Sequence, residues 1–415
     1  MRVGVIGLGY VGLPLAVAFA QRGASVVGVD RDERKLAALA AGDSYIADVS
    51  GEELAAVLPR LSPSSNFGPL AEADAVIICA PTPLSRNREP DLSALLDCVT
   101  KLGDVLRAGQ LVVIQSTTYP GTTRERVAPL LEERSGLRAG VDFNLAFSPE
   151  RVDPGRTDFV LANTPKVVGG LTDACLDRAE ELYAIVCDEV VRVSTLEAAE
   201  MTKLLENIFR AVNIALVNEL SLLTDRMGID IWEVIEAAST KPYGFMRFEP
   251  GPGMGGHCLP VDPFYLAWRA REFDMAAEFV ELAGKINQQM PYHCVEKVQR
   301  VLNERGLPVR GARIVLLGVA YKPDIGDTRE SPAIKLIELL RRLGADVVYH
   351  DEYVPELERF DLRSLPLPAA LDGAAMALIV TAHTGIDYDA LARDAECVLD
   401  LRGVTAAGAA HVVRL

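Results

Sequence analysis

The sequence has few of the features that mark a nucleic-acid-binding or metal-binding protein. Basic residues are outnumbered, with 42 Lys and Arg against 58 Asp and Glu, so the formal net charge is −16. A net negative charge argues against nucleic acid as a partner, although it is compatible with local basic pockets for phosphate. The 7 cysteines include no CxxC pair and no zinc-ligand spacing. We therefore expect no metal site and a reducing compartment.

Long uninterrupted hydrophobic runs are also absent. The most apolar stretch, residues 3–20, is broken by 4 glycines and a proline, and it carries neither a charged flank nor a small-residue cleavage site. We expect a soluble, cytoplasmic protein with no membrane association. At 415 residues, of which 49% are hydrophobic, the chain exceeds what one core usually holds. It should therefore form two or three domains.

A dinucleotide-binding pattern explains the apolar N-terminus. Buried parallel strands are predicted at residues 2–6 and 25–29, with a helix at residues 14–21 between them. The second strand ends at an acidic residue, Asp30. Three glycines in GxGxxG spacing join the first strand to the helix: Gly7, Gly9 and Gly12. A glycine-rich turn without a ligand is the alternative, but the full strand, turn, helix and acid unit favours a dinucleotide.

Each residue of this pattern has a chemical reason. Gly7 permits the tight turn, Gly9 lets the backbone approach a pyrophosphate, and Gly12 lets helix and strand pack. The N-terminus of the helix offers free N–H groups to the phosphates. Asp30 should accept hydrogen bonds from ribose hydroxyls and repel a 2′-phosphate. The predicted cofactor is therefore NAD, not NADP.

The α/β alternation continues through the first third of the chain. Strands are predicted at residues 75–79, 111–115 and 144–147, with a closing strand at 166–169. Polar side chains follow these strands at their carboxyl ends, where open α/β sheets bind ligands: Thr82, Thr117, Thr118, Ser148 and Glu150. Any single Ser or Thr there is more often a turn residue or a helix cap than a ligand-binding group.

Helical periodicity begins at residue 196. Helices are predicted at residues 196–227, 231–239, 262–271 and 275–302. On the first helix, several apolar residues should share one face: Leu196, Leu204, Leu205, Ile208, Val212, Leu216 and Leu220. Lys203 and Asn207 project from one side because they are four residues apart, and together they could stabilise an oxyanion. A solvated lysine beside an asparagine is the alternative.

The glycine- and proline-rich stretch at residues 250–263 contains a candidate nucleophile. Cys258 follows His257 in a tight loop, and Asp262 comes four residues later. A thiolate there could attack a carbonyl while neighbouring groups move protons. An unreactive packed cysteine is the usual case for a cysteine taken alone.

The last third restarts an α/β pattern without a second GxGxxG. Residues 306–311 predict a hinge, and strands are predicted at 313–317, 346–350, 377–381 and 398–401. A helix should open at Ser331, with serine as the N-cap. We expect this second fold to bind a different ligand, a nucleotide diphosphate carried by the substrate.

Six motifs in order resemble the nucleotide-sugar 6-dehydrogenase family, which includes UDP-glucose, UDP-N-acetylglucosamine, UDP-N-acetylmannosamine and GDP-mannose dehydrogenases. The matching segments are residues 7–12, 116–122, 148–150, 203–207, 255–262 and 321–332. The resemblance implies two Rossmann-like, doubly wound α/β domains joined by a helical segment that forms a homodimer. The expected domains are 1–195 for NAD, 196–305 with the cysteine loop, and 306–415 for the UDP-sugar.

The resemblance also implies a mechanism and a set of site residues. NAD would oxidise the sugar C6 alcohol twice, through a thiohemiacetal and a thioester on the catalytic cysteine. The implied catalytic residues are Cys258, Lys203, Asn207, Asp262, Thr117 and Glu150. The implied NAD contacts are Gly7, Gly9, Tyr10, Val11, Gly12, Asp30, Lys35, Pro81, Thr82, Thr117 and Arg329. The implied substrate contacts are Glu150, Arg151, Lys203, Asn207, Arg247, Gly255, Cys258, Lys322 and Arg402.

The choice of sugar depends on few positions. The segments around Pro83, Arg151 and Gly255 resemble the UDP-N-acetylhexosamine branch, above all the UDP-N-acetylglucosamine enzymes. UDP-glucose enzymes typically carry Phe-Leu and a lysine where this chain has Arg151-Val152 and Val261. UDP-N-acetylglucosamine is the predicted substrate, with UDP-glucose, dTDP-glucose and UDP-N-acetylmannosamine as alternatives.

Two other classes share part of the pattern. A β-hydroxyacid dehydrogenase also combines a Rossmann domain with a lysine-asparagine pair, but it needs no thiol and transfers one hydride. A non-catalytic NAD sensor or scaffold would not need Cys258, Lys203, Asn207 and Asp262 together.

Overall fold

The computed structural model describes residues 1–46, 48–85, 87–152, 158–256, 261–406 and 408–415. It divides into two compact units. The first unit comprises Met1–Glu206 and Phe264–Met275, and the second comprises Asn207–Pro263 and Ala276–Leu415. The division into three domains at residues 195 and 305 stays a prediction. Within the described part of the chain, no helix combines the length and apolar character needed to cross a membrane.

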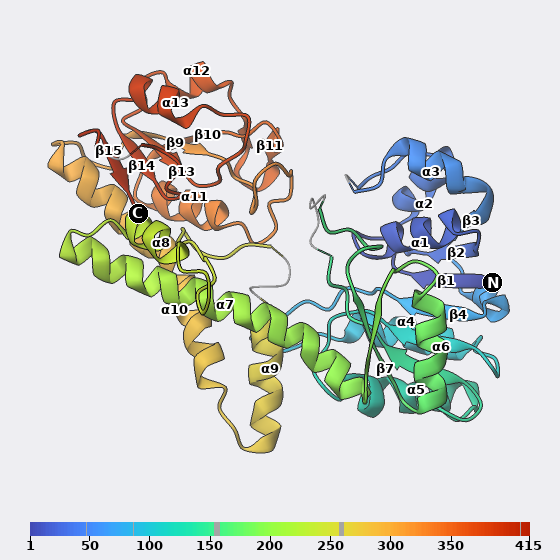
Figure 1. Cartoon of the computed structure of the whole chain (residues 1–415). Helices are drawn as coiled ribbons and strands as arrows, with labels where there is room; N and C mark the ends of the chain where they lie inside the picture. The colour runs from blue at the N-terminus through green and yellow to red at the C-terminus, as the bar shows by residue number, and fades with distance from the viewer. Residues whose placement is uncertain (47, 86, 153–157, 257–260, 407) are drawn as a thin grey trace. The chain divides into compact units, whose positions relative to one another are not determined.

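The first unit is built on an eight-stranded sheet (Figure 1). Its strands, in sheet order, are β3 (Leu61–Ser64), β2 (Ser25–Val29), β1 (Arg2–Ile6), β4 (Ala75–Ile78), β5 (Leu111–Ile114), β6 (Asn144–Phe147), β7 (Lys166–Gly170) and β8 (Val190–Val193). Neighbours are parallel except for the antiparallel pair β6 and β7. The strand order reverses beside β1, which pairs with both β2 and β4. Such a reversal is where doubly wound sheets bind ligands.

The predicted end of this sheet is wrong. Lys166–Gly170 is not the closing strand, because β8 pairs with it in parallel and extends the sheet by one strand. The sequence analysis predicted neither β8 nor β3. Both missed strands are short edge strands: β8 is only partly buried and β3 contains Pro63. Edge strands tolerate proline and exposed positions, so their hydrophobic pattern is weak.

Helices cover both faces of the sheet. They are α1 (Gly12–Gln21), α2 (Glu33–Ala41), α3 (Gly51–Val57), α4 (Ser93–Gly103), α5 (Ala128–Ser135), α6 (Asp173–Tyr183) and the first part of α7 (Leu196–Met227). In β4, Ala75 and Ile77 join the core formed with α1 and α6. Val76 and Ile78 point to the opposite face and are also fully buried. Burial on both faces is why these strands read as continuous apolar runs.

The second unit contains a five-stranded parallel sheet. Its order is β10 (Asp346–His350), β9 (Arg313–Leu317), β13 (Met376–Ile379), β14 (Val398–Asp400) and β15 (Val412–Arg414). A small hairpin pairs β11 (Glu356–Leu357) with β12 (Leu362–Arg363). The helices are α8 (Ile231–Ser239), α9 (Asp262–Ala270, mostly in the first unit), α10 (Glu278–Glu304), α11 (Pro332–Arg342), α12 (Leu367–Leu371) and α13 (Tyr388–Asp394). Alternate residues of β9 enter two separate cores, one on each face. The predicted fold class, with two doubly wound α/β sheets, is confirmed.

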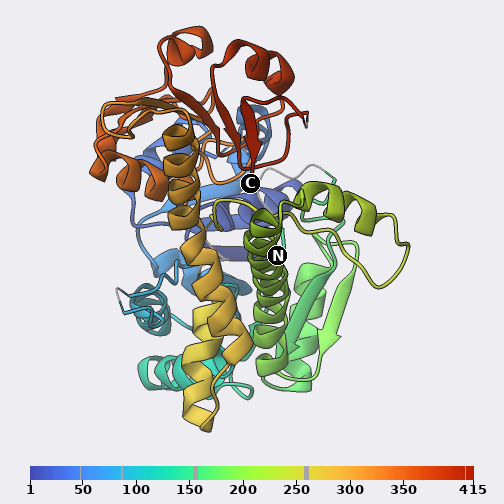
Figure 2. The ribbon, with the colours of Figure 1, turned by 90° about the vertical axis from the view of Figure 1, so that its left-hand side faces the viewer.

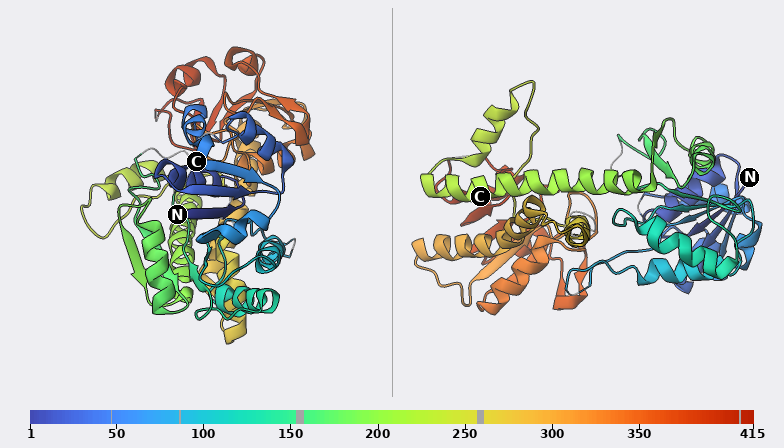
Figure 3. Two further views of the ribbon diagram at one scale, coloured as in Figure 1. Left: turned by 90° about the vertical axis from the view of Figure 1, so that its right-hand side faces the viewer. Right: turned by 90° about the horizontal axis from the view of Figure 1, so that it is seen from below.

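The two long helices α7 and α10 follow the first sheet in the chain. α7 is one continuous helix with the predicted bounds (Figure 3). In the second unit it runs beside α10 (Figure 2), where Lys297 Nζ lies 2.7 Å from Asp225 Oδ1. The apolar residues predicted to share one face of α7 differ in burial. Leu196 and Leu204 are buried, but Leu205, Leu216 and Leu220 are 41–59% exposed.

Candidate active site

The glycine turn between β1 and α1 has the geometry of a dinucleotide loop. Gly7 has φ +90°, and a Cβ there would lie 2.5 Å from the Cys79 carbonyl oxygen. A Cβ on Gly12 would lie 1.8 Å from the Gly7 carbonyl oxygen, so both glycines are required by the packing of the backbone. A Cβ on Gly9, by contrast, would meet no atom within 4 Å. Glycine at this position therefore leaves room outside the protein, as a bound pyrophosphate requires.

The start of α1 is open to a ligand. Val11 is its N-cap and makes no side-chain capping bond, and Tyr10 is 44% exposed at the turn. An uncapped helix N-terminus with its partial positive charge suits a phosphate.

Asp30 holds the same turn from the end of β2. It is 9% exposed, its Oδ2 accepts from the Leu8 backbone N–H at 2.9 Å, and Lys35 Nζ lies 3.2 Å from that oxygen. Its Oδ1 accepts from the Asp32 N–H at 2.9 Å. The hydrogen bonds place the carboxylate at the carboxyl end of β2, where an NAD ribose fits this fold.

The ends of β4 and β5 are tied together. The Thr82 hydroxyl donates to the Thr117 carbonyl oxygen at 2.7 Å, and Pro81 beside it is exposed. Tyr265 of α9, fully buried, donates its hydroxyl to the Thr82 carbonyl oxygen at 2.7 Å. Sequence reasoning missed Tyr265, since its partner is 183 residues away.

Glu150 lies in a buried polar network at the end of β6. Its Oε2 accepts from Gln115 at 2.6 Å and lies 3.0 Å from Lys166 Nζ. Its Oε1 accepts from the backbone N–H groups of Arg151 and Val152 at 2.9 and 2.8 Å. Burial alone would raise the pKa of Glu150, but Lys166 and these hydrogen bonds bring it below its ordinary value. Glu150 is therefore held as an anion, and its role in ordering water stays a prediction.

Sequence reasoning missed the groups that support Glu150. Lys166 is 1% exposed and its Nζ lies 5.1 Å from the centre of the Tyr183 ring. The Tyr183 hydroxyl donates to Gln115 at 2.7 Å. The one available signal was a lysine opening an otherwise apolar strand. Arg151 itself pairs with Glu206 of α7 at 2.8 Å.

Two of the predicted catalytic residues, Asn207 and Asp262, meet inside the second unit. Asn207 Nδ2 donates to Asp262 Oδ2 at 2.5 Å, and the two side chains are 4% and 2% exposed. Lys203 is half-buried one turn earlier on α7. His257 and Cys258 lie outside the described residues. Asp262 opens α9, four positions after Cys258 in the chain.

The glycine loop before Cys258 is fixed by two buried amides. Asn218 of α7 accepts from the Gly251 N–H at 2.9 Å and donates to Asn287 of α10 at 2.8 Å. Asn287 also donates to the Ala211 carbonyl oxygen at 3.0 Å. A Cβ on Gly255 would lie 2.6 Å from the Tyr321 Cβ. The close approach that this glycine permits in the structure is therefore to the loop after β9.

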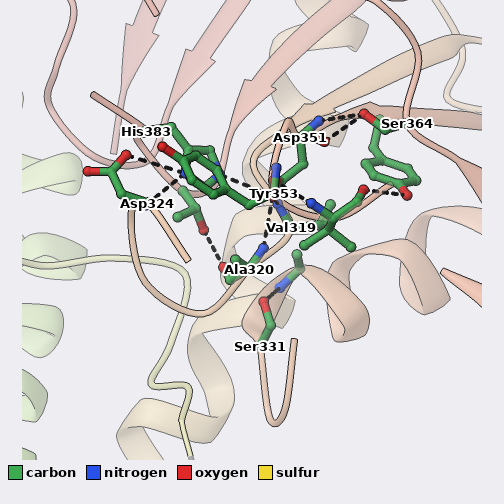
Figure 4. Close-up of polar contacts among 12 residues, drawn as sticks. Val319, Ala320, Asp324, Ser331, Asp351, Tyr353, Ser364 and His383 are labelled. Carbon is green, nitrogen blue, oxygen red and sulfur yellow. Dashed lines mark hydrogen bonds and ion pairs between the residues drawn. The ribbon is translucent and has the colours of Figure 1, made fainter. Parts of the chain in front are cut away.

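That loop, which carries Tyr321 and the half-buried Lys322, is held by an acidic residue at the end of β10 (Figure 4). Asp351 accepts from the N–H groups of Val319 and Ala320 at 2.7 and 3.2 Å, and its Oδ2 lies 3.0 Å from His383 Nε2. His383 Nδ1 accepts from the Asp324 N–H, so the ring proton is on Nε2. Burial raises the pKa of Asp351, but the His383 and backbone hydrogen bonds bring it below its ordinary value.

The remaining predicted arginines lie in the second unit. Arg329 pairs with Asp327 at 2.6 Å, and exposed Arg247 pairs with Glu236 and Glu249. Arg402 donates from Nε to the Val380 carbonyl oxygen at 2.6 Å, and burial lowers its pKa. Their ligand contacts stay predictions. Among the described residues, no group of three or more His, Cys, Asp and Glu side chains is placed to hold a metal.

Comparison with known proteins finds matches in all three parts of the chain. Models of the UDP-glucose/GDP-mannose dehydrogenase family match at residues 1–187 (NAD binding domain), 197–289 (central domain) and 315–407 (UDP binding domain). UDP-N-acetyl-D-mannosamine dehydrogenase of Pyrococcus horikoshii is 38% identical over 92% of this chain and 90% of its own length. UDP-N-acetyl-D-glucosamine 6-dehydrogenase of Pseudomonas aeruginosa is 36% identical over 85% and 83%.

A solved structure from the same group of relatives has a similar fold. The UDP-D-ManNAc dehydrogenase structure from Pyrococcus horikoshii superposes with a TM-score of 0.91 and 34% identity, covering 100% of this chain and 98% of that one. The glycine turn, the open helix N-terminus and Asp30 fit the NAD that the first family model names. The chain therefore belongs to the UDP-glucose/GDP-mannose dehydrogenase family and is an NAD-dependent nucleotide-sugar dehydrogenase.

Proposed function

We propose that the protein oxidises the C6 hydroxymethyl group of a UDP-N-acetylhexosamine to the uronic acid in two successive two-electron steps. The observation that carries the proposal is the buried hydrogen bond between Asn207 and Asp262. It bears on the chemistry because Asp262 directly follows the cysteine loop in the chain. An asparagine and a carboxylate held in this way are suited to an oxyanion and to a proton, respectively. NAD, when bound, accepts one hydride from the substrate carbon in each oxidation.

The residues of the chain have separate roles in this scheme. The Cys258 thiolate adds to the C6 aldehyde from the first oxidation, forming a C–S bond and a thiohemiacetal oxyanion. Lys203 and Asn207 stabilise that oxyanion. Loss of hydride in the second oxidation leaves a thioester, which water cleaves to the acid and the free thiol. Asp262 moves the proton, while Thr117 and ionised Glu150 hold water and cofactor in place.

Sequence motifs and the names of related proteins both narrow the choice of substrate sugar. UDP-N-acetylglucosamine is the first candidate from the residues around Arg151 and Gly255. Relatives named for UDP-N-acetyl-D-mannosamine and for UDP-N-acetyl-D-glucosamine both match over most of the chain. UDP-N-acetylmannosamine is therefore the second candidate, ahead of UDP-glucose and dTDP-glucose.

A homodimer is part of the proposal. α7 carries six large apolar side chains that are 41–61% exposed, and five of them follow one another from Phe209 to the end of the helix: Phe209, Leu216, Leu220, Leu223 and Met227. They are 7, 4, 3 and 4 residues apart, the spacing of a helix seam that packs against another helix. A second copy of α7 would cover them. The cytoplasmic location stays a prediction from the sequence.

The test is the number of NADH molecules formed per sugar nucleotide consumed, with NAD in excess. We expect two NADH from one UDP-N-acetylhexosamine. One NADH per substrate would instead indicate a single-step dehydrogenase that needs no thiol, and no NADH from any candidate would favour a non-catalytic NAD-binding protein.

Two variants test the covalent step. Cys258→Ala should form no acid, and Cys258→Ser should stall before acid release because an oxygen ester replaces the thioester. We expect at least about a 1000-fold loss of acid production, within the range for removing a nucleophile. Acid formation by Cys258→Ala at the wild-type rate would rule out the covalent role.

A further inference from the structure

Glu200 is a buried carboxylate to which the proposed chemistry assigns no role. It lies on α7, three residues before Lys203, and is fully buried. A buried carboxylate is costly unless its oxygens are hydrogen-bonded, so its partners indicate what it is for.

All four donors to Glu200 come from the segment that follows Thr117 at the end of β5. Its Oε2 accepts from the Gly121 backbone N–H at 2.6 Å. Its Oε1 accepts from the Thr123 backbone N–H at 2.9 Å and the Thr123 hydroxyl at 2.7 Å. The Thr118 hydroxyl donates to the same oxygen at 3.3 Å.

This segment lacks a cap of its own. A short π-helical turn begins at Thr123, and its N-cap, Thr122, makes no side-chain capping bond because its hydroxyl donates to Tyr119 instead. Gly121 has φ +99°, a conformation that few other residues adopt. Glu200 therefore supplies, from another helix, the acceptor that the first N–H groups of this turn need.

We propose that Glu200 is a positioning residue that holds the Thr117 loop in the conformation that receives NAD. The loop is held from two sides, because the Thr82 hydroxyl binds the Thr117 carbonyl oxygen and Glu200 binds the residues that follow. The inference rests on the proposed contact between Thr117 and the cofactor. Glu200 acts through the loop and touches no reacting atom.

The ionisation of Glu200 offers a specific readout. Burial raises its pKa to about 7, against the lowering effect of Thr123 and Gly121. Three further sets of charged groups surround Glu200. Glu197 adds to the rise in its pKa, and Arg124 pairs with Glu197 at 2.6 Å. The Arg269–Glu125 ion pair lies beside Gly121. Only the ionised carboxylate can accept from all four donors. Protonation places an O–H against one of them, so the loop should loosen below about pH 7.

The residue ranges of the first unit contain no histidine. All 5 histidines lie in residue ranges of the second unit. No other side chain of the first unit has an ordinary pKa between about 5 and 8.

The experiment is calorimetric titration of NAD into the full-length protein, without sugar, from about pH 8 to about pH 6. With a pKa of about 7, the ionised fraction falls about 10-fold over this range, and the wild-type affinity for NAD should fall by a similar factor. Glu200→Gln keeps the shape but loses one acceptor, so it should bind NAD about 10-fold more weakly at pH 8, with no pH slope. In turnover, its KM for NAD should rise more than its kcat falls.

Glu197→Gln is the matched control, since it removes a neighbouring carboxylate whose ion pair is part-exposed and reaches the same turn. It should keep the wild-type affinity at pH 8, while the fall in affinity should move to lower pH because Glu197 no longer raises the pKa of Glu200. If Glu200→Gln does not fold, Thr123→Val, which removes one donor, should weaken NAD binding about threefold, while Thr123→Ser should not. Wild-type affinity and slope in Glu200→Gln, or in Thr123→Val, would overturn the proposal. Because no sugar is present, failure of the proposed oxidation would leave this result unaffected.

Discussion

At the scale of single residues, the ion pair of Lys166 and Glu150 shows how a charge is kept inside the first sheet. Their side chains are 2% and 15% exposed, and Gln115 and Tyr183 complete the network. A buried pair of this kind adds little to stability beyond an apolar pair, but removing one partner leaves the other uncompensated. The pair therefore serves to keep Glu150 ionised and oriented.

Lys166→Met tests this arrangement through stability. We expect the free energy of unfolding to fall by about 3–5 kcal/mol near neutral pH, as measured by urea denaturation. In the wild type the depressed pKa of Glu150 adds stability above its unfolded pKa of 4.5, and that contribution is lost as the pH falls. The variant should therefore differ most at neutral pH and least in acid.

The control is Lys101→Met, which breaks an exposed pair with Asp97. It should change the free energy of unfolding by less than about 1 kcal/mol. An equal loss in Lys166→Met at neutral and acid pH would show that packing, not charge, is what the lysine contributes.

At the scale of elements, α7 and α10 are joined by an amide relay that ends on the loop before Cys258. Asn218 and Asn287 are both nearly inaccessible to solvent, at 0% and 3%, so each lost hydrogen bond leaves a buried polar group. The relay fixes Gly251, and with it the start of the glycine-rich loop.

Asn287→Leu should break the relay. We expect the free energy of unfolding to fall by about 2 kcal/mol, because the Asn218 amide loses its acceptor. The kcat should fall by about 10-fold, while the affinity for NAD, measured without sugar, should not change. Asn213→Ala is the control: its amide donates to Phe209 within α7 and should affect neither quantity. A loss of stability with unchanged kcat would separate the relay from the cysteine loop.

At the scale of the whole molecule, the proposed homodimer depends on the exposed apolar seam of α7. The five side chains from Phe209 to Met227 lie along one helix at heptad-like spacing. Two carboxylates placed in such a seam would repel their counterparts in a second copy.

The double variant Leu216→Glu with Leu223→Glu should therefore be monomeric. Light scattering should give about twice 44.8 kDa for the wild type and about 44.8 kDa for the variant. Leu307→Glu, at an exposed leucine in the turn after α10, should remain dimeric. A wild-type protein that is monomeric at micromolar concentration would contradict the proposed dimer.

Local patterns in the sequence by themselves determined the cofactor turn and the long helices. The strand, glycine, helix and acid unit from Arg2 to Asp30 was predicted with its strand bounds, and α7 with both ends. These elements could be predicted because the period of a helix or strand and the backbone demands of Gly7 and Gly12 act within a few residues. The edge strands β3 and β8 escaped because their patterns are short and mixed.

Only the tertiary structure decided which buried polar groups support the site. Glu200 meets its donors across 77–82 residues, Asn218 meets Asn287 across 69, and Lys166 meets Glu150 across 16. No periodicity links such positions, because their contacts depend on how helices and strands pack. The same holds for α7: its apolar period predicted a helix, but packing decided that Leu204 is buried and Leu205, Leu216 and Leu220 are exposed.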